Sequence, residues 1–311
     1  MELLKIENIS KQYAGHKALE NISIQIKKGE IFGLLGPNGA GKTSLIRIIN
    51  QITGPDEGVV YLNGNPITQK DISKIGYLPE ERGLYKKMRV YEQVLYFAQL
   101  KGLDKTTAKQ KINYWFEKFD ITSWYSKKVE ELSKGMAQKI QFIITVLHEP
   151  EFLILDEPFS GFDPINAQII RNEILELKKN GTSILLSTHN MNSVEEICDS
   201  IALINESKLV LHGELDEVKN RFKTNTYVVH FKGHLLGFAN ALFASFALEH
   251  SEQITEETAI AHVKLLHGNS LNDLLKTIIP VVEIISVNEV LPTMNEIFIS
   301  AVNKKGGGED E

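Results

Sequence analysis

The sequence has very little of three things: cysteine, excess positive charge and long apolar runs. Its one cysteine, Cys198, excludes an intramolecular disulfide framework and is typical of a reducing compartment. The 34 basic residues are outnumbered by 40 acidic ones, for a net charge of −6, which argues against the basic face of a nucleic-acid-binding protein. The longest apolar run, Leu235–Leu248, includes Asn240 and is shorter than a membrane span, so it predicts one buried helix.

The N-terminal sequence MELLKIENIS also lacks the basic and then apolar profile of a secretion signal, so we expect a cytoplasmic protein. A length of 311 residues with 42% apolar side chains favours about two domains. We place the domains at residues 1–220 and 221–303, and expect a flexible tail over residues 304–311. No internal repeat is visible.

The spacing of apolar residues predicts the helices and strands. Alternating apolar and polar residues predict an antiparallel strand pair over residues 3–9 and 19–26. Three- and four-residue apolar steps predict helices between residues 90 and 129. Two apolar runs, at residues 152–156 and 182–188, flank a helical stretch and predict a βαβ unit with buried parallel strands. The residues after 222 mix both periods, which indicates a small α+β domain.

A glycine-rich loop follows the apolar stretch GEIFGLLG. Its letters, GPNGAGKT, match G-x-x-x-x-G-K-[ST] in full, and a helical run follows. Glycines let backbone N–H groups close around phosphate oxygens, Lys42 reaches the terminal phosphates, and the Thr43 hydroxyl can ligate Mg²⁺. We therefore predict a nucleotide phosphate site formed by Gly36, Pro37, Asn38, Gly39, Ala40, Gly41, Lys42, Thr43 and Ser44.

Two adjacent carboxylates follow the apolar strand in FLILDEP. Ligands of open α/β sheets gather at the carboxyl ends of strands, where Asp156 and Glu157 stand. Asp156 is predicted to hold Mg²⁺. Glu157 is predicted to orient and polarise the attacking water, because phosphoryl transfer depends on positioning and charge stabilisation.

The order of these motifs resembles the nucleotide-binding subunit of ABC transporters over roughly residues 1–220. The glycine loop and LILDEP stand at the two Walker motifs, and Tyr13 stands where the family has an aromatic that stacks on adenine. SGFD, residues 160–163, occupies the D-loop, which crosses the dimer interface in the family and contains Asp163. His189 takes the switch-histidine position, which contacts the γ-phosphate.

The resemblance implies an α/β fold of the P-loop ABC ATPase type. Its parts would be a mixed sheet core, an antiparallel β subdomain and a helical subdomain at about residues 90–135, followed by the C-terminal α+β domain. It implies ATP and Mg²⁺ as cofactors. It also implies a homodimer or a paired ATPase subunit on separate transmembrane permease subunits, peripheral on the inner face of the plasma membrane.

A second helix start, LSKGM, stands at the signature position, where the family has LSGGQ. By resemblance, Ser133, Lys134 and Gly135 face the γ-phosphate held by the partner chain, so two ATP molecules would lie between two chains. Lys134 and Met136 depart from the family pattern. Glu80 departs as well, because it stands where the family has a glutamine that contributes to the ATP and Mg²⁺ site.

The departures, together with the LPEERGLY segment at residues 78–85, resemble the exporter branch of sodium-efflux and drug-efflux ATPases. The resemblance therefore implies an ATPase that powers export. Two alternatives stay open: an ABC ATPase that acts on ribosomes or DNA, and a regulatory protein that binds ATP without hydrolysing it. The scattered histidines at positions 230, 234, 250, 262 and 267 lack metal-ligand spacing, so we do not expect a metal site there.

Overall fold

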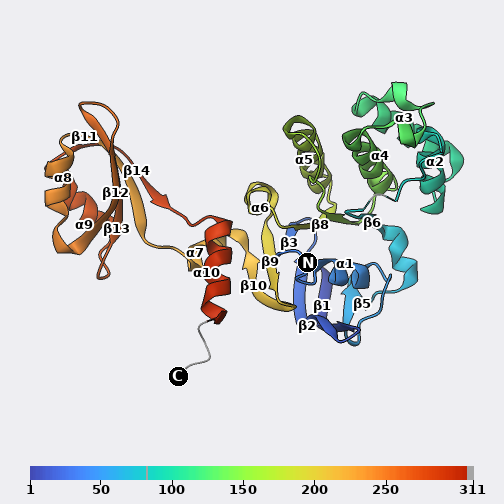
Figure 1. Ribbon diagram of the computed structural model, residues 1–311, viewed down its shortest axis with the longest axis horizontal. Helices are drawn as coiled ribbons and strands as arrows, with labels where there is room; N and C mark the ends of the chain where they lie inside the picture. The colour runs from blue at the N-terminus through green and yellow to red at the C-terminus, as the bar shows by residue number, and fades with distance from the viewer. Residues whose placement is uncertain (82, 307–311) are drawn as a thin grey trace. The chain divides into compact units, whose positions relative to one another are not determined.

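The computed structural model describes the backbone of residues 1–81 and 83–306 (Figure 1). Two compact units make up the chain: an N-terminal unit of residues 1–215 with the segment from Ala301, and a C-terminal unit, Asp216–Ser300. The predicted domain boundary near residue 220 stays a prediction. Helix α10, Met294–Gly306, takes in the first residues of the expected tail, and residues 307–311 lie outside the described residues.

A six-stranded sheet forms the centre of the N-terminal unit. Its order is β10-β9-β3-β8-β7-β6; five strands run parallel, and β10 pairs antiparallel with β9. All residues of β3, β7 and β8 are buried, as expected for apolar strands covered on both faces. The strands are β3 Ile31–Leu35, β6 Ile75–Leu78, β7 Phe152–Asp156, β8 Ser183–Thr188, β9 Ser200–Asn205 and β10 Lys208–Glu214.

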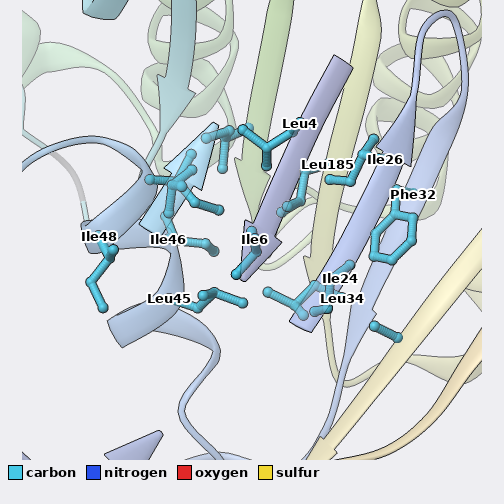
Figure 2. Packing of buried hydrophobic residues seen from close by; sticks show 14 of the residues in the cluster. Leu4, Ile6, Ile24, Ile26, Phe32, Leu34, Leu45, Ile46, Ile48 and Leu185 are labelled. Atoms are coloured by element: carbon cyan, nitrogen blue, oxygen red, sulfur yellow. The ribbon is translucent and has the colours of Figure 1, made fainter. Parts of the chain in front are cut away.

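A second, antiparallel sheet has the order β2-β1-β4-β5. Its strands are β1 Glu2–Tyr13, β2 His16–Lys27, β4 Glu57–Leu62 and β5 Asn65–Pro66, so the predicted antiparallel pair is confirmed and extended. This sheet shares one hydrophobic core with β3 and with helix α1, Lys42–Ile49. Figure 2 shows Ile6 and Ile24 of the antiparallel sheet near Leu45 of α1. Burying each such side chain stabilises the fold by about 1.5–3 kcal/mol, which holds α1 and the glycine loop in place.

The helices of the N-terminal unit follow the predicted pattern. They are α2 Val90–Leu100, α3 Lys105–Lys118, α4 Lys134–Val146, α5 Pro164–Lys179 and α6 Met191–Ile197, with 3₁₀ turns at Gln69–Lys74, Thr122–Trp124 and Val129–Glu131. Several of these helices have a side-chain oxygen as their N-cap: that of Asp104 caps α3, that of Ser133 caps α4 and that of Asp163 caps α5. Cys198, directly after α6, is a free cysteine and buried.

The C-terminal unit is an antiparallel sheet of order β12-β13-β11-β14 with two helices on one face, as the α+β prediction required. In its core the rings of Phe231 and Phe238 stack with centroids 4.3 Å apart. The elements are β11 Thr226–Lys232, α8 Leu235–Leu242, a 3₁₀ turn at Phe243–Ser245, β12 Phe246–Gln253, β13 Thr258–Leu265, α9 Leu271–Ile278 and β14 Glu283–Val290. Helix α7, Leu215–Arg221, spans the division between the units.

The prediction of one helix over Leu235–Leu248 is wrong. Helix α8 ends at Leu242, Phe243 has a left-handed backbone with φ +43°, and β12 begins at Phe246. Apolar composition alone does not separate a buried helix from a buried strand, and here one run supplies both. None of the helices in the described chain is long and apolar enough to cross a membrane.

Candidate nucleotide-binding site

Four of the predicted site segments lie at the carboxyl ends of strands in the six-stranded sheet. Strands β3, β8, β7 and β6 are consecutive neighbours and run parallel, so their carboxyl ends lie side by side. The glycine loop follows β3, Glu157 follows β7, His189 follows β8 and Glu80 follows β6 closely. This edge is where open α/β sheets bind ligands.

The glycine loop has a backbone that other residues would not adopt. Gly36 and Gly41 have φ values of +149° and +114°, and a Cβ atom at either would overlap a backbone carbonyl oxygen, that of Ile204 or of Ala18. Inside the loop, the Lys42 ammonium donates to the carbonyl oxygens of Gly36, at 2.7 Å, and of Pro37, at 3.1 Å. The loop therefore holds its own cation where phosphates would bind.

Helix α1 begins directly after this loop. Its N-cap is Gly41, and among the described residues no side chain caps the N–H groups of the first turn. The first turn also has no acidic residue. Open N–H groups and the positive end of the helix dipole favour an anion at this position.

One cleft brings most of the predicted ATP residues together, whereas Gly36, Pro37, Ala40 and His189 are not in its lining. Its lining includes Tyr13, a residue that is 39% exposed, and the carboxylates of Glu80, Asp156 and Glu157. The aromatic residue, the phosphate loop and the acids thus line a single space. The lining is Tyr13, His16, Ala18, Asn38, Gly39, Gly41, Lys42, Thr43, Ser44, Glu80, Asp156 and Glu157.

Buried charge dominates the electrostatics of this cleft. Burial lowers the pKa of the Lys42 ammonium, and the carboxylates of Glu157, Asp156 and Glu80 act in the opposite direction. Burial also raises the pKa of Asp156, which is 3% exposed, and the charges of Glu80 and Glu157 add to that rise. A cation at this position would reverse the shift at Asp156 by favouring the ionised form.

The donor set fits Mg²⁺ bound together with a nucleotide. A hydroxyl, Thr43, and two carboxylates, Asp156 and Glu80, line the cleft beside the phosphate loop. Among the described residues, no group of three His, Cys, Asp or Glu side chains could hold a metal alone. Mg²⁺ bound with a nucleotide typically takes one or two protein carboxylates and completes its coordination shell with phosphate oxygens and water.

Glu157 is held in a fixed position by its neighbours. Its backbone is left-handed, with φ +50°, and its side chain is 10% exposed. One carboxylate oxygen accepts from the His189 backbone N–H at 2.9 Å and contacts His189 Nδ1 at 2.6 Å. The other accepts from the Thr188 hydroxyl at 3.0 Å. Sequence reasoning missed Thr188, although a hydroxyl directly before His189 in STHN was the available signal.

The signature and D-loop residues lie outside the lining of this cleft. Ser133 Oγ accepts from the Met136 N–H at 3.3 Å and so caps α4. Asp163 accepts from the Asn166 N–H at 3.0 Å and caps α5. Lys134 is exposed, and its side chain lies against Gly161 of the same chain. None of the three completes the nucleotide site of its own chain.

Comparison with known proteins identifies the family. A family model described as ABC transporter matches residues 19–160, and one described as ATP-binding protein DrrA1-3-like, C-terminal domain, matches residues 213–302. The uncharacterized ABC transporter ATP-binding protein YhaQ of Bacillus subtilis is 46% identical over 228 residues, 73% of this chain and 76% of YhaQ. The chain belongs to the ABC transporter ATP-binding proteins.

Two further similarities support this assignment. The linearmycin resistance ATP-binding protein LnrL of Bacillus subtilis is 33% identical over 229 residues, 73% of this ABC ATPase and 74% of LnrL. The structure of cbiO1 from Clostridium perfringens, part of the ABC transporter complex cbiONQ, is 28% identical with a TM-score of 0.61. It covers 71% of this chain and 94% of cbiO1.

Membership gives this ABC ATPase its activity: it binds ATP and hydrolyses it to power transport. The fold prediction is confirmed by the ABC ATPase architecture and by the C-terminal α+β unit. The roles of individual side chains remain predictions, which the geometry of the cleft allows to be stated in testable form.

Proposed function

We propose that two copies of this ABC ATPase close around two Mg-ATP molecules. Each nucleotide lies on the glycine loop of one chain and beneath the start of α4 of the other. The observation that supports this most directly is the incomplete cleft: it gathers Tyr13, Lys42 and Glu157, whereas Ser133 and Gly135 are not part of it. ATP then joins the two chains, and hydrolysis separates them.

In this proposal Glu157 orients and polarises the attacking water. Its hydrogen bonds to Thr188 and His189 hold the carboxylate in place before ATP binds. Lys42 offsets the charge that spreads over the phosphate oxygens, since phosphoryl transfer relies on positioning and electrostatic stabilisation. When bound, Mg²⁺ adds to this neutralisation, and Thr43, Asp156 and Glu80 are the residues that would hold it.

We further propose that hydrolysis drives export through separate transmembrane subunits. The described chain has no membrane-spanning helix, so the translocation path would belong to other subunits. LnrL is a resistance protein, and cbiO1 is part of a transporter complex, which supports both the direction and the assembly. The ATPase would then lie on the cytoplasmic face of the plasma membrane. Copurification with ribosomes instead of a multi-span membrane protein would contradict this part.

A substitution of Glu157 tests the nucleotide sandwich. Glu157→Gln keeps the shape of the side chain but removes its charge, so we expect ATP binding with turnover at least roughly 100-fold slower. ATP then stays bound, and the variant should migrate as an ATP-dependent dimer in gel filtration. Glu151→Gln is the matched control, because Glu151 directly precedes the other end of β7 and is exposed. A monomer at saturating ATP, for a variant that binds ATP normally, contradicts the sandwich.

A further inference from the structure

Helix α4 carries a polar stripe that the proposed function leaves without a role. The stripe consists of Lys134, Gln138 and Gln141, whose spacing of four and three residues places them on one face. Elsewhere the helix buries mainly apolar side chains. Gln141 is nevertheless only 7% exposed, although a buried amide costs free energy unless its hydrogen bonds are made.

Gln141 contacts the segment that contains Glu80. Its side-chain amide donates to the carbonyl oxygens of Pro79, at 3.3 Å, and Glu81, at 3.4 Å. These two carbonyl groups flank Glu80, which lines the nucleotide cleft. Gln141 thus holds the backbone on both sides of a residue that faces the nucleotide.

Gln138 and Lys134 contact the D-loop instead. The Gln138 amide donates to the carbonyl oxygen of Ser160, three residues after Glu157. The Lys134 side chain lies over Gly161, whose φ is +79° and where a Cβ atom would overlap Lys134 Cε. One helix face therefore contacts both segments that border the acidic residues.

The two segments and the glutamines of the stripe line a small polar cavity that shares residues with the nucleotide cleft. Glu80, Asp156 and Glu157 line both spaces, and Gln138 and Gln141 line the cavity. A hydrogen-bonded helix is rigid over this distance, with a rise of about 1.5 Å per residue. A displacement of α4 would therefore move the Glu80 segment and the D-loop together.

We propose that the α4 stripe positions the Glu80 segment and the D-loop relative to Glu157, so that Gln138 and Gln141 are positioning residues for ATP hydrolysis. This inference rests on the proposed function in one respect: Glu157 of the same chain orients the attacking water.

The test compares steady-state kinetics of Gln138→Met, Gln141→Met and the double variant. Methionine keeps the size of glutamine but cannot donate, so each single change should lower kcat about tenfold, the scale of one lost hydrogen bond. KM for ATP should stay within about twofold, because neither residue touches the nucleotide. Gln110→Met, on the exposed surface of α3, is the matched control and should leave kcat unchanged.

The double variant distinguishes a shared positioning role of the two glutamines from two independent effects on kcat. If the hydrogen bonds from Gln138 and Gln141 together maintain one alignment, the loss of either bond already disrupts that alignment. The double variant should then be no more than about threefold slower than either single variant. A loss near 100-fold in the double variant, kcat within twofold of wild type in the singles, or a raised KM at constant kcat overturns the proposal. Where a methionine variant melts earlier, Gln141→Asn and Gln138→Asn replace it, since asparagine stays polar and neutral but is one methylene too short to reach the same carbonyl oxygens.

Gel filtration distinguishes failure of this inference from failure of the sandwich. Each methionine change combined with Glu157→Gln should still give an ATP-dependent dimer, because the stripe acts on hydrolysis and not on closure. If Glu157→Gln alone stays monomeric, the sandwich fails whatever the stripe variants do. If it dimerises while the stripe variants keep full kcat, the stripe proposal alone fails.

Discussion

The two units of this ABC ATPase share one construction but differ in where they bury polar groups. Each packs helices on a sheet around an apolar core. The N-terminal unit buries Lys42, Asp156 and Gln141 among its core elements. Among the described side chains of the C-terminal unit, Thr226 is the one polar residue that is buried.

This difference in buried polar groups shows which unit accepts a cost in folding stability at a functional site. A polar group without compensation costs about 1–3 kcal/mol on burial in proteins, and a charge costs more. The N-terminal unit bears that cost where parallel strands end, and it adds a left-handed Glu157 backbone at the same edge. The described residues of the C-terminal unit form a stacked aromatic core without a comparable buried polar cluster, and the ABC transporter family model matches residues 19–160, within the N-terminal unit.

The largest expected effect comes from the buried cation. Lys42→Ala removes the ammonium that lies inside the phosphate loop, and we expect ATP turnover to fall by about 1,000-fold. Lys276→Ala, on the exposed surface of α9, is the counterpart in the C-terminal unit and should change turnover by less than twofold. Steady-state ATPase rates of the two variants test this difference. Similar losses of turnover in both variants would contradict the contrast between the two units.

A smaller effect is expected at the hydroxyl that holds Glu157. Thr188→Val keeps the side-chain shape but removes the hydrogen bond to the carboxylate, so kcat should fall about tenfold with little change in KM. Thr277→Val is the matched control, because the Thr277 hydroxyl makes one bond, to the Asp273 carbonyl at 2.9 Å, in the C-terminal unit. Full activity of Thr188→Val would show that His189 suffices to hold Glu157.

The smallest effect on hydrolysis should follow from a large loss in the C-terminal core. Phe231→Ala removes a fully buried ring and should destabilise that unit by about 3–5 kcal/mol, seen as an earlier thermal transition. ATPase activity below that transition should stay within about twofold of wild type. Phe152→Ala, an equally buried change in β7, should lower both stability and activity. A tenfold loss of activity in folded Phe231→Ala would place the C-terminal unit in the catalytic cycle.

Local motifs made much of the site predictable from sequence. The glycine loop is one continuous segment, and Asp156 and Glu157 are adjacent at the end of β7, so the chemistry of each motif depends on neighbours in the chain. The periodicities of residues 3–26 and 90–129 gave the correct element types, because one face of each element is buried. The alignment of strand ends followed from parallel pairing.

Contacts between segments that are distant in the chain could not be predicted from the sequence. The bond between Thr188 and Glu157 and the bonds from Gln141 to the Glu80 segment join residues that are tens of positions apart. No periodicity signals which carbonyl a glutamine reaches. The prediction for Leu235–Leu248 failed for a different reason: the helix ends at Leu242 and a strand begins at Phe246, and apolar residues alone do not show such a change.

The most direct test of the central claim, that each nucleotide site is shared between two chains, is a mixing experiment. Ser133→Arg and Lys42→Ala are each expected to be inactive alone. Mixed in equal amounts, they form heterodimers with one intact shared site, so ATPase activity should return to roughly a quarter of the wild-type rate, since half of the dimers pair unlike chains. No recovery in a mixture whose heterodimers are demonstrated by differently tagged chains would contradict the account.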